Sequence, residues 1–267
     1  TSFESAFRTW AKRPTKTLIA KPNETMNPLL STPLHTVLQQ LRTLSNLLFP
    51  RYCAICGKRL TTNEIALCIT CNWHLPRTYQ HLTPRDNLLC RLYWRKVPIE
   101  RAAAWFYYAA KSPVSKAIYT MKYHHRAIIG EQLGYMMAKE MAPEGFFDGV
   151  DCLIPVPLTP ARKRQRGYNQ SRCIAEGVAR ITGIPILDKV LIRTHFAGSQ
   201  TKADVQMRQK NVQHAFQLTR PQAIKGRHVL LIDDVVTTGA TTLACAKALA
   251  EAEGVVISVL ALGVVKE

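Results

Sequence analysis

Apolar and polar residues alternate along residues 102–267 in blocks that predict strands and helices in turn. Short apolar runs predict buried strands over 102–109, 152–156, 184–192, 229–232 and 255–265. Apolar residues at helical spacing predict helices over 115–123, 131–141, 171–182 and 242–253. Strands that alternate with helices are typical of an α/β protein, in which helices cover both faces of a parallel sheet. We expect that fold for residues 102–267.

The segment VLLIDDVVTTGAT at 229–241 combines three features that rarely occur together. The apolar strand Val229–Ile232 is followed by two adjacent carboxylates, Asp233 and Asp234, where the strand is expected to end. A loop rich in hydroxyl groups then leads into a helix; its residues are Thr237, Thr238, Gly239, Ala240 and Thr241. Ligands of open α/β sheets bind at the carboxyl ends of strands, and the free N–H groups at a helix start suit a phosphate. The segment therefore predicts a phosphate site.

The neighbouring residues narrow the chemistry of that site. Gly239 lets the backbone approach a ligand, and the threonine hydroxyls can donate further hydrogen bonds. The absence of a following Gly-Lys-Ser/Thr excludes the nucleotide-binding P-loop. Two carboxylates beside a phosphate need sugar hydroxyls or a magnesium ion as partners. The alternative is an ordinary strand, turn and helix whose strand ends on acidic residues.

Four cysteines near the N-terminal side form the pattern C-x2-C-x11-C-x2-C. They are Cys53, Cys56, Cys68 and Cys71. Two such knuckles supply four thiolates for tetrahedral zinc and leave no open coordination position, so the site is expected to be structural. The alternative is a set of unmetallated or redox-active thiols. Cys90 stands alone and is expected to be a buried thiol.

The remaining N-terminal residues divide into two stretches. Residues 1–31 carry scattered prolines and charges without a sustained period, which indicates a disordered or extension segment. Residues 34–48 have apolar residues at helical spacing, so we expect an amphipathic helix. The predicted organisation is thus 1–31, then a helix with a zinc ribbon over 32–101, then an α/β domain over 102–267.

The chain is strongly basic, with a formal net charge of +18 over 267 residues and a sequence pI near 9.8. That balance favours a polyanionic partner, either nucleic acid or a multiply phosphorylated substrate, although a solvated basic surface would give the same charge. The longest apolar stretch, 255–265, is too short to cross a bilayer. No secretory signal is recognisable, so a cytoplasmic location is the default expectation.

Two polar stretches flank the predicted strands. The segment PVPLTPARKRQRGYNQS at 155–171 carries a basic cluster directly after a strand. Residues 194–215 hold few apolar residues and include Gln200 and Arg208. Polar loops of this kind often close over the substrate of a sheet enzyme.

The segment 229–241 resembles the 5-phosphoribosyl-1-pyrophosphate (PRPP) motif of type I phosphoribosyltransferases. Together with the cysteine ribbon and the segment 155–171, it makes residues 45–265 resemble the ComF family of competence-associated, phosphoribosyltransferase-like proteins. The resemblance implies a type I phosphoribosyltransferase-like α/β fold preceded by a small zinc ribbon with four cysteine ligands.

The resemblance also implies roles for individual residues. The loop residues Thr237, Thr238, Gly239, Ala240 and Thr241 would hold the 5-phosphate. Asp233 and Asp234 would accept hydrogen bonds from the ribose hydroxyls, and Mg²⁺ would bridge those hydroxyls and the pyrophosphate. The backbone at Val156 and Pro157 would approach the pyrophosphate. Arg162 and Arg166 would give cationic support, and Gln200 and Arg208 would belong to the flexible loop.

Two functions follow from the resemblance. One is a phosphoribosyltransferase that uses PRPP and magnesium, with an acceptor that the sequence does not identify. The other is a non-catalytic competence factor that retains the phosphate site and binds single-stranded DNA or a protein. Both imply a link to DNA uptake in natural transformation, where cytosolic family members are thought to act with a helicase partner.

Overall fold

The computed structural model describes residues 50–123, 126–194 and 215–266. The predicted amphipathic helix at 34–48 and the segment 1–31 lie outside these residues. Gln200 and Arg208 do so as well.

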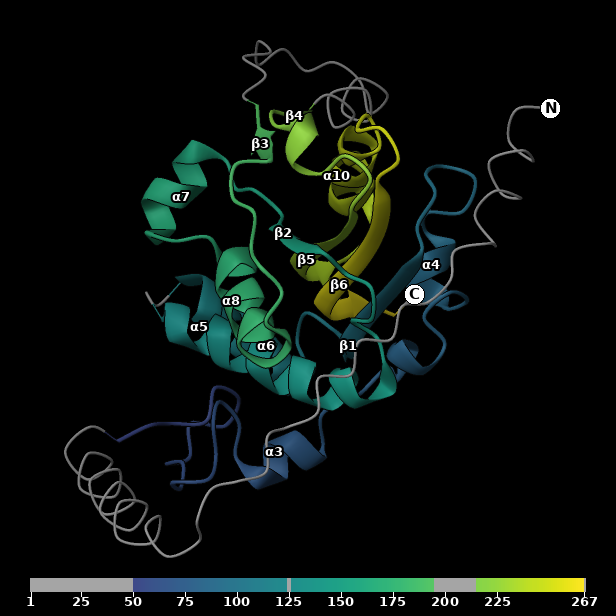
Figure 1. Cartoon of the computed structure of the whole chain (residues 1–267). Helices are drawn as coiled ribbons and strands as arrows, with labels where there is room; N and C mark the ends of the chain where they lie inside the picture. The colour runs from purple at the N-terminus through teal and green to yellow at the C-terminus, as the bar shows by residue number, and fades with distance from the viewer. Residues whose placement is uncertain (1–49, 124–125, 195–214, 267) are drawn as a thin grey trace, which may run out of the picture. The chain divides into compact units, whose positions relative to one another are not determined.

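A four-stranded parallel sheet forms the centre of the fold, as predicted (Figure 1). Its strand order is β1-β6-β5-β2, so the two strands that are last in the chain lie in the middle. The strands are β1 (Arg101–Tyr108), β2 (Cys152–Pro155), β5 (His228–Val236) and β6 (Val256–Val265). Central parallel strands are covered on both faces, which explains why β5 and β6 begin as nearly unbroken apolar runs.

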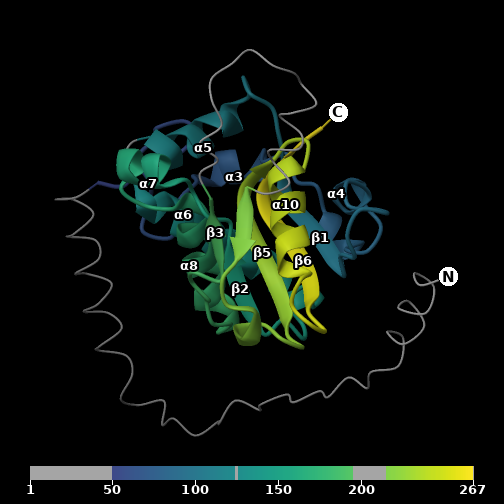
Figure 2. The same ribbon diagram turned by 90° about the horizontal axis from the view of Figure 1, so that it is seen from above.

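Helices lie on both faces of the sheet (Figure 2), and a cluster of buried apolar residues fills the space on each face. Leu230 and Ile232 of β5 point to the face covered by three helices, which are α5 (Pro113–Tyr123), α6 (Ala127–Met141) and α8 (Gln170–Thr182). Val229 and Leu231 point to the face covered by α4 (Leu88–Arg91) and α10 (Ala240–Leu249). The alternation follows from the two-residue period of a strand. Helices on both faces are thereby confirmed.

The helices α6 and α8 pack at very short range through glycines. A Cβ atom on Gly134 would lie 2.2 Å from the carbonyl oxygen of Ile174. A Cβ atom on Gly177 would lie 2.0 Å from the carbonyl oxygen of Glu131. Only residues without a side chain permit this approach. This close packing matters for the candidate site, because α8 begins beside Asp233 and Asp234 of β5.

Smaller elements complete the described part of the chain. They are α3 (Ile69–Trp73), η2 (Gln80–Leu82), η3 (Ala142–Glu144), α7 (Pro160–Arg166), β3 (Leu191–Arg193), β4 (Phe216–Leu218) and η4 (Pro221–Ala223). The strand predicted over 184–192 was largely wrong: only β3 and an isolated bridge at Ile186 form there, and β3 pairs antiparallel with β4. Residues 185–187 do lie beside the edge strand β2, where Ile186 forms a parallel bridge with Leu153, but the pairing ends because the chain turns at Asp188 and Lys189.

The basic segment after β2 forms a helix that the sequence did not predict. The Thr159 hydroxyl caps the first turn of α7 by accepting from the Arg162 N–H at 3.2 Å. Pro160 occupies the first turn, and Gly167 ends the helix with φ of +79°. These are standard start and stop residues, so the local sequence specifies α7 although it has no apolar face.

The buried side chain of His228, the first residue of β5, should make the free energy of unfolding decrease at acid pH. Its Nδ1–H donates to the Gly149 carbonyl (3.1 Å), and its Nε2 accepts from the Ser258 hydroxyl (2.8 Å). Burial lowers the pKa of His228 from 6.5 to about 4. Its contribution is therefore complete above pH 6.5 and is lost as pH falls toward 4, which corresponds to about 3 kcal/mol. When urea unfolding is measured from pH 7 to 4, the free energy of unfolding should decline less for His228→Gln than for the wild type. Equal declines in the two proteins would contradict this prediction.

Candidate functional site

The two acids lie inside β5 rather than after its end, which corrects the sequence-based expectation. The neighbouring strand β2 stops at Pro155, opposite Ile232. On the other side, β6 continues to pair with β5, with Asp233 opposite Ala261 and Val236 opposite Val264. Because β6 keeps supplying hydrogen bonds, β5 runs on through the acids. They therefore lie where the sheet has lost one strand.

Asp233 is buried and held in place by two donors. Its exposed fraction is 8%, its Oδ1 accepts from the Ser171 hydroxyl (3.2 Å), and the same oxygen accepts from the Asp234 N–H (2.8 Å). Ser171 stands in the first turn of α8, while Asn169 is the residue that caps this helix. Burial, and then the charge of Asp234, raises the pKa of Asp233 to about 7. A ligand that donates hydroxyl hydrogens would relieve this crowding of negative charge.

Asp234 is paired with a lysine from a distant helix. The Lys122 ammonium lies 2.8 Å from Asp234 Oδ2, and the Val235 N–H donates to Oδ1 at 2.6 Å. Lys122 is in the last turn of α5. Lys122 was not among the residues that the sequence predicted for the site. No local pattern could have identified the pair, because α5 and β5 are brought together by the sheet.

The hydroxyl loop presents its groups to solvent at the start of α10. Thr237, Thr238 and Ala240 are exposed, and Thr241 is half-buried. Gly239 takes the N-cap position with φ of +74°, and no side chain caps the helix. A Cβ atom there would also lie 3.2 Å from a methyl group of Leu92. The first N–H groups of α10 therefore have no capping side chain, which suits an anion.

Buried hydrogen bonds hold the turn at Gly239 in place. The Tyr93 hydroxyl, which is buried, donates to Thr242 Oγ1 at 2.7 Å. Thr242 Oγ1 in turn donates to the Gly239 carbonyl at 3.1 Å. This chain of hydrogen bonds holds Gly239 and the start of α10 in one conformation. Tyr93 and Thr242 were not predicted as site residues, and their partnership depends on the tertiary fold.

Val156 and Pro157 follow β2. Both backbone groups of Val156 already form hydrogen bonds within the protein. The Val156 N–H donates to the Ile232 carbonyl (2.9 Å), and the Val156 carbonyl accepts from Asn169 Nδ2 (3.0 Å). Pro157 is half-buried. The Val156 backbone thus ties this segment to β5 and to the start of α8.

The basic residues expected near the pyrophosphate occupy different surroundings. Arg162 is exposed on α7. Arg166 is buried, its Nη1 donates to Gln170 Oε1 (2.8 Å), and its guanidinium lies 5.3 Å from the Tyr123 ring. Arg193 of β3 was not predicted. Burial and the charge of Arg162 lower the pKa of Arg193, whereas the charge of Asp233 acts in the opposite direction.

The four cysteines of the two knuckles come together as predicted. All four Sγ atoms lie within 4.8 Å of one another, and those of Cys56 and Cys68 are 3.7 Å apart. Tetrahedral zinc with Zn–S bonds of about 2.3 Å requires sulfur separations of roughly 3.8 Å. Gly57, with φ of +74°, turns the chain after the first knuckle, and Cys68 caps α3. This cluster can hold a zinc ion.

The lone Cys90 and the lengths of the helices also bear on the sequence-based expectations. Cys90 is buried, and its thiol donates to the Pro84 carbonyl at 3.0 Å, which agrees with the expected buried thiol. None of the helices in the described ranges has the length and apolar character needed to cross a membrane.

Comparison with curated proteins shows relatives over most of the chain. The "DNA utilization protein YhgH" of Escherichia coli K12 is 30% identical over 200 residues, which cover 74% of this chain and 83% of that protein. "Competence protein F" of Haemophilus influenzae is 35% identical over 34% of this chain and 40% of its own length. "Competence protein ComFC" of Bacillus subtilis is 30% identical over 37% of this chain and 38% of its own length.

Comparison with solved structures gives a weaker likeness. The glutamine PRPP amidotransferase from B. subtilis matches with a TM-score of 0.34 and 25% identity, covering 51% of this chain and 26% of that one. No protein-family model matches the chain. Over the length shared with the E. coli and Shigella flexneri relatives, however, identity and coverage place this chain in the ComF family of competence-associated, phosphoribosyltransferase-like proteins.

Proposed function

We propose that this protein binds PRPP or a related ribose phosphate at the turn between β5 and α10, and that it serves in DNA uptake. The observation that carries the ribose-phosphate site is the buried pair Asp233 and Asp234 directly before an uncapped, glycine-led helix start. Hydroxyl-binding acids and phosphate-binding N–H groups thus stand together. The link to DNA rests on the names of the relatives.

The phosphate would lie at the start of α10. Thr237 and Thr238 are exposed there, and the N–H groups of the first turn have no side-chain cap. The helix dipole adds positive potential at this end. Gly239 is required on both conformational and steric grounds, because its φ is +74° and Leu92 packs against it.

The sugar would lie against the acids. Asp233 and Asp234 would accept hydrogen bonds from the ribose hydroxyls, with Ser171 and Lys122 holding the carboxylates in position. The pair offers only oxygen ligands, which fits Mg²⁺, and the ion would supply charge neutralisation for the pyrophosphate. Exposed Arg162, and Val156 with Pro157, would border the pyrophosphate. Gln200 and Arg208 remain predicted loop residues.

If catalysis occurs, the sugar carbon develops positive charge as pyrophosphate leaves. The nearby carboxylates would stabilise that cation electrostatically, and Arg162 and Arg193 would stabilise the leaving group. Little covalent chemistry is needed from the protein. The phosphoribosyl group would pass to a nucleophilic acceptor, whose new bond to the sugar carbon replaces the bond to pyrophosphate.

A second function shares the site without catalysis. The Lys122 ammonium already pairs with Asp234 in this structure, so that carboxylate does not need a metal ion as its counter-charge. The protein would then use ribose phosphate as a bound ligand while other surfaces hold single-stranded DNA or a helicase partner. The four-cysteine cluster would contain structural zinc in either case, and reduced thiolates of this kind are typical of the cytoplasm.

Thermal unfolding with PRPP and Mg²⁺ tests the ribose-phosphate site. Ligand at 100 times its Kd should add about 2.7 kcal/mol to the free energy of unfolding. Asp234→Ala and Asp233→Asn should abolish this gain, while Asp86→Ala, which removes an exposed acid paired with Arg91, should keep it. Release of pyrophosphate on addition of an acceptor mixture would separate the catalytic function from the binding function.

The unliganded variants provide the control for folding. Because the pKa of Asp233 is raised, its ionisation opposes folding once the pH exceeds the ordinary carboxyl value. Asp233→Asn should therefore be at least as stable as the wild type at pH 8 without ligand. Retention of the PRPP effect in both acid variants would show that the site is wrongly assigned.

A further inference from the structure

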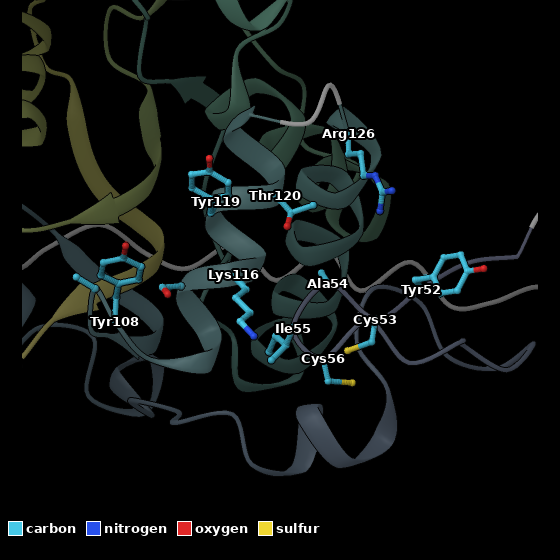
Figure 3. Close-up of a pocket in the computed structure, with 13 residues that line it drawn as sticks. Tyr52, Cys53, Ala54, Ile55, Cys56, Tyr108, Lys116, Tyr119, Thr120 and Arg126 are labelled. Atoms are coloured by element: carbon cyan, nitrogen blue, oxygen red, sulfur yellow. The ribbon is translucent and has the colours of Figure 1, made fainter.

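Two lysines of helix α5 lie in different surroundings, and one of them reaches the acid pair. Lys116 is exposed and, with Tyr119, lines the pocket beside the first cysteine knuckle, where its side chain extends toward the knuckle (Figure 3). Lys122 is half-buried and lies one turn beyond Ile118, which belongs to the buried cluster on that face of the sheet. Lys122 thus follows the covered side of the helix. The last turn of α5 thereby places an ammonium group at Asp234.

The ion pair between Lys122 and Asp234 is largely withdrawn from solvent. The two side chains are 22% and 7% exposed, and Lys122 Nζ lies 2.8 Å from Asp234 Oδ2. Oδ2 is buried and accepts no hydrogen bond of good geometry from the residues that the structure describes. Because a buried carboxylate without a counter-charge is costly, the ammonium group carries the compensation at this oxygen.

Two residues that follow β2 in the chain hold the end of α5 in place. The Tyr168 hydroxyl donates to the carbonyl of Met121, whose side chain is fully buried. The Arg166 guanidinium lies 5.3 Å from the centroid of the Tyr123 ring. Both chain neighbours of Lys122 are therefore fixed by contacts from the basic segment after β2. This basic segment thus positions Lys122 beside the acids, a role that its sequence did not predict.

We propose that Lys122 is a specificity-determining residue that takes the place of a divalent cation at Asp234, so that the site binds a ribose 5-phosphate without a metal ion on its carboxylates. The acids have the oxygen ligands that Mg²⁺ requires. A metal ion on Oδ2, however, would need a bond of about 2.1 Å to an oxygen that already has an ammonium group 2.8 Å away. Two cations at that range repel each other, whereas the hydroxyl groups of a ribose are neutral. Magnesium would therefore enter with a pyrophosphate group rather than on the acids.

The ligand class deepens the proposed function and rests on it. A compound with a 5-phosphate and ribose hydroxyls has the groups that the start of α10 and the acid pair would bind, and it brings no metal-binding pyrophosphate. Ribose 5-phosphate is such a compound, and we expect it to bind without added metal. PRPP should bind better with Mg²⁺, because its pyrophosphate holds the ion. The exclusion of metal from Asp234 does not rest on ribose-phosphate binding, so it is tested separately.

Electron paramagnetic resonance of Mn²⁺ tests the exclusion in the unliganded full chain, because Mn²⁺ takes the same oxygen ligands as Mg²⁺. Lys122→Met removes the charge and keeps a long side chain. This variant should bind Mn²⁺ at least roughly tenfold more tightly than the wild type, since a neighbouring charge changes the affinity of a carboxylate for a cation by that factor or more. Lys122→Arg should restore weak binding, and the exposed control Lys116→Met should match the wild type. Equal Mn²⁺ affinity in the wild type and Lys122→Met would overturn the proposal.

A second variant keeps this test decisive if Lys122→Met is poorly stable. The double variant Lys122→Met/Asp234→Asn removes both members of the ion pair, so it leaves no uncompensated carboxylate at Asp234. Mn²⁺ should raise the Tm of Lys122→Met and leave that of the double variant unchanged. An equal rise in both variants would place the ion elsewhere and overturn the proposal.

Titration calorimetry with ribose 5-phosphate tests the ligand class, in magnesium-free buffer without a chelator so that the cysteine cluster keeps its zinc. The wild type should bind with the same affinity before and after Mg²⁺ is added. Lys122→Met should bind roughly tenfold more weakly without Mg²⁺ and recover with it, because the uncompensated carboxylate repels the phosphate. Binding by the wild type only with Mg²⁺ would overturn the inference. If the wild type binds neither ribose 5-phosphate nor PRPP, the proposed function fails, whereas the Mn²⁺ comparison still decides the role of Lys122.

Discussion

Removal of zinc from the cluster of four cysteines is expected to unfold residues 50–75 and to leave the parallel sheet folded. This segment is too short to hold itself together, and structural zinc contributes roughly 10–16 kcal/mol of apparent binding energy in comparable peptides. The segment also covers part of the core, because Leu60, Leu67 and Leu75 belong to the buried cluster beneath α5 and α6. The global free energy of unfolding should therefore fall as well.

Elemental analysis and hydrogen exchange measure these effects. The wild type should contain one zinc ion per chain, and Cys68→Ser should contain none. The Cys53 N–H, bonded to the Lys58 carbonyl, and the Ala54 N–H, bonded to the Ala66 carbonyl, should lose protection in the variant. Cys90→Ser is the matched control, because that buried thiol lies outside the cluster. Full protection of both amides without metal would contradict a zinc-dependent ribbon.

Replacement of Gly177 by alanine is expected to destabilise the protein by more than about 3 kcal/mol, beyond the usual range for overpacking. The added methyl group would lie 2.0 Å from the Glu131 carbonyl oxygen and 2.5 Å from the Tyr135 nitrogen. Both are backbone atoms, so the helices α6 and α8 must separate. The helix preference of alanine over glycine, about 1 kcal/mol, offsets only part of this loss.

Urea unfolding compares Gly177→Ala with a milder substitution in the same pair of helices. A methyl group on Gly130 would meet the Cys173 Cβ at 3.0 Å and the Met121 sulfur at 3.2 Å. The Met121 side chain can rotate, and the contact with Cys173 needs a shift of only a few tenths of an ångström. Gly130→Ala should therefore lose much less stability. Gly177→Ala should also weaken PRPP stabilisation, because α8 carries Ser171 to Asp233. A loss for Gly177→Ala no larger than that for Gly130→Ala would show that the two helices separate easily.

The parts of the fold that sequence analysis predicted depend on short-range patterns. Apolar runs in β5 and β6 indicate strands buried on both faces, and the two cysteine knuckles bring ligands together through local turns. The same holds for the start of α10, where Gly239 supplies a left-handed residue and threonines surround it. In each case the residues that matter are neighbours in the chain, so their spacing defines the local geometry.

The features that sequence analysis missed depend on neighbours supplied by the sheet. β5 runs past Asp233 because β6 continues beside it, although β2 has ended. The stretch at 184–192 is apolar enough for a strand, yet it pairs with β2 only around Ile186 and then turns away to form β3, which pairs with β4. Strand length and sheet membership depend on available hydrogen-bond partners, and these are set by the arrangement of the whole sheet.

The sequence by itself determined the type of fold, the cluster of four cysteines and the residues of the candidate phosphate turn, because each is encoded by periodicity or by close spacing. Only the tertiary structure decided that Lys122 pairs with Asp234 and that Tyr93 supports the turn through Thr242. These contacts join residues far apart in the chain. Their distances follow from how helices pack on the sheet, which no local pattern specifies.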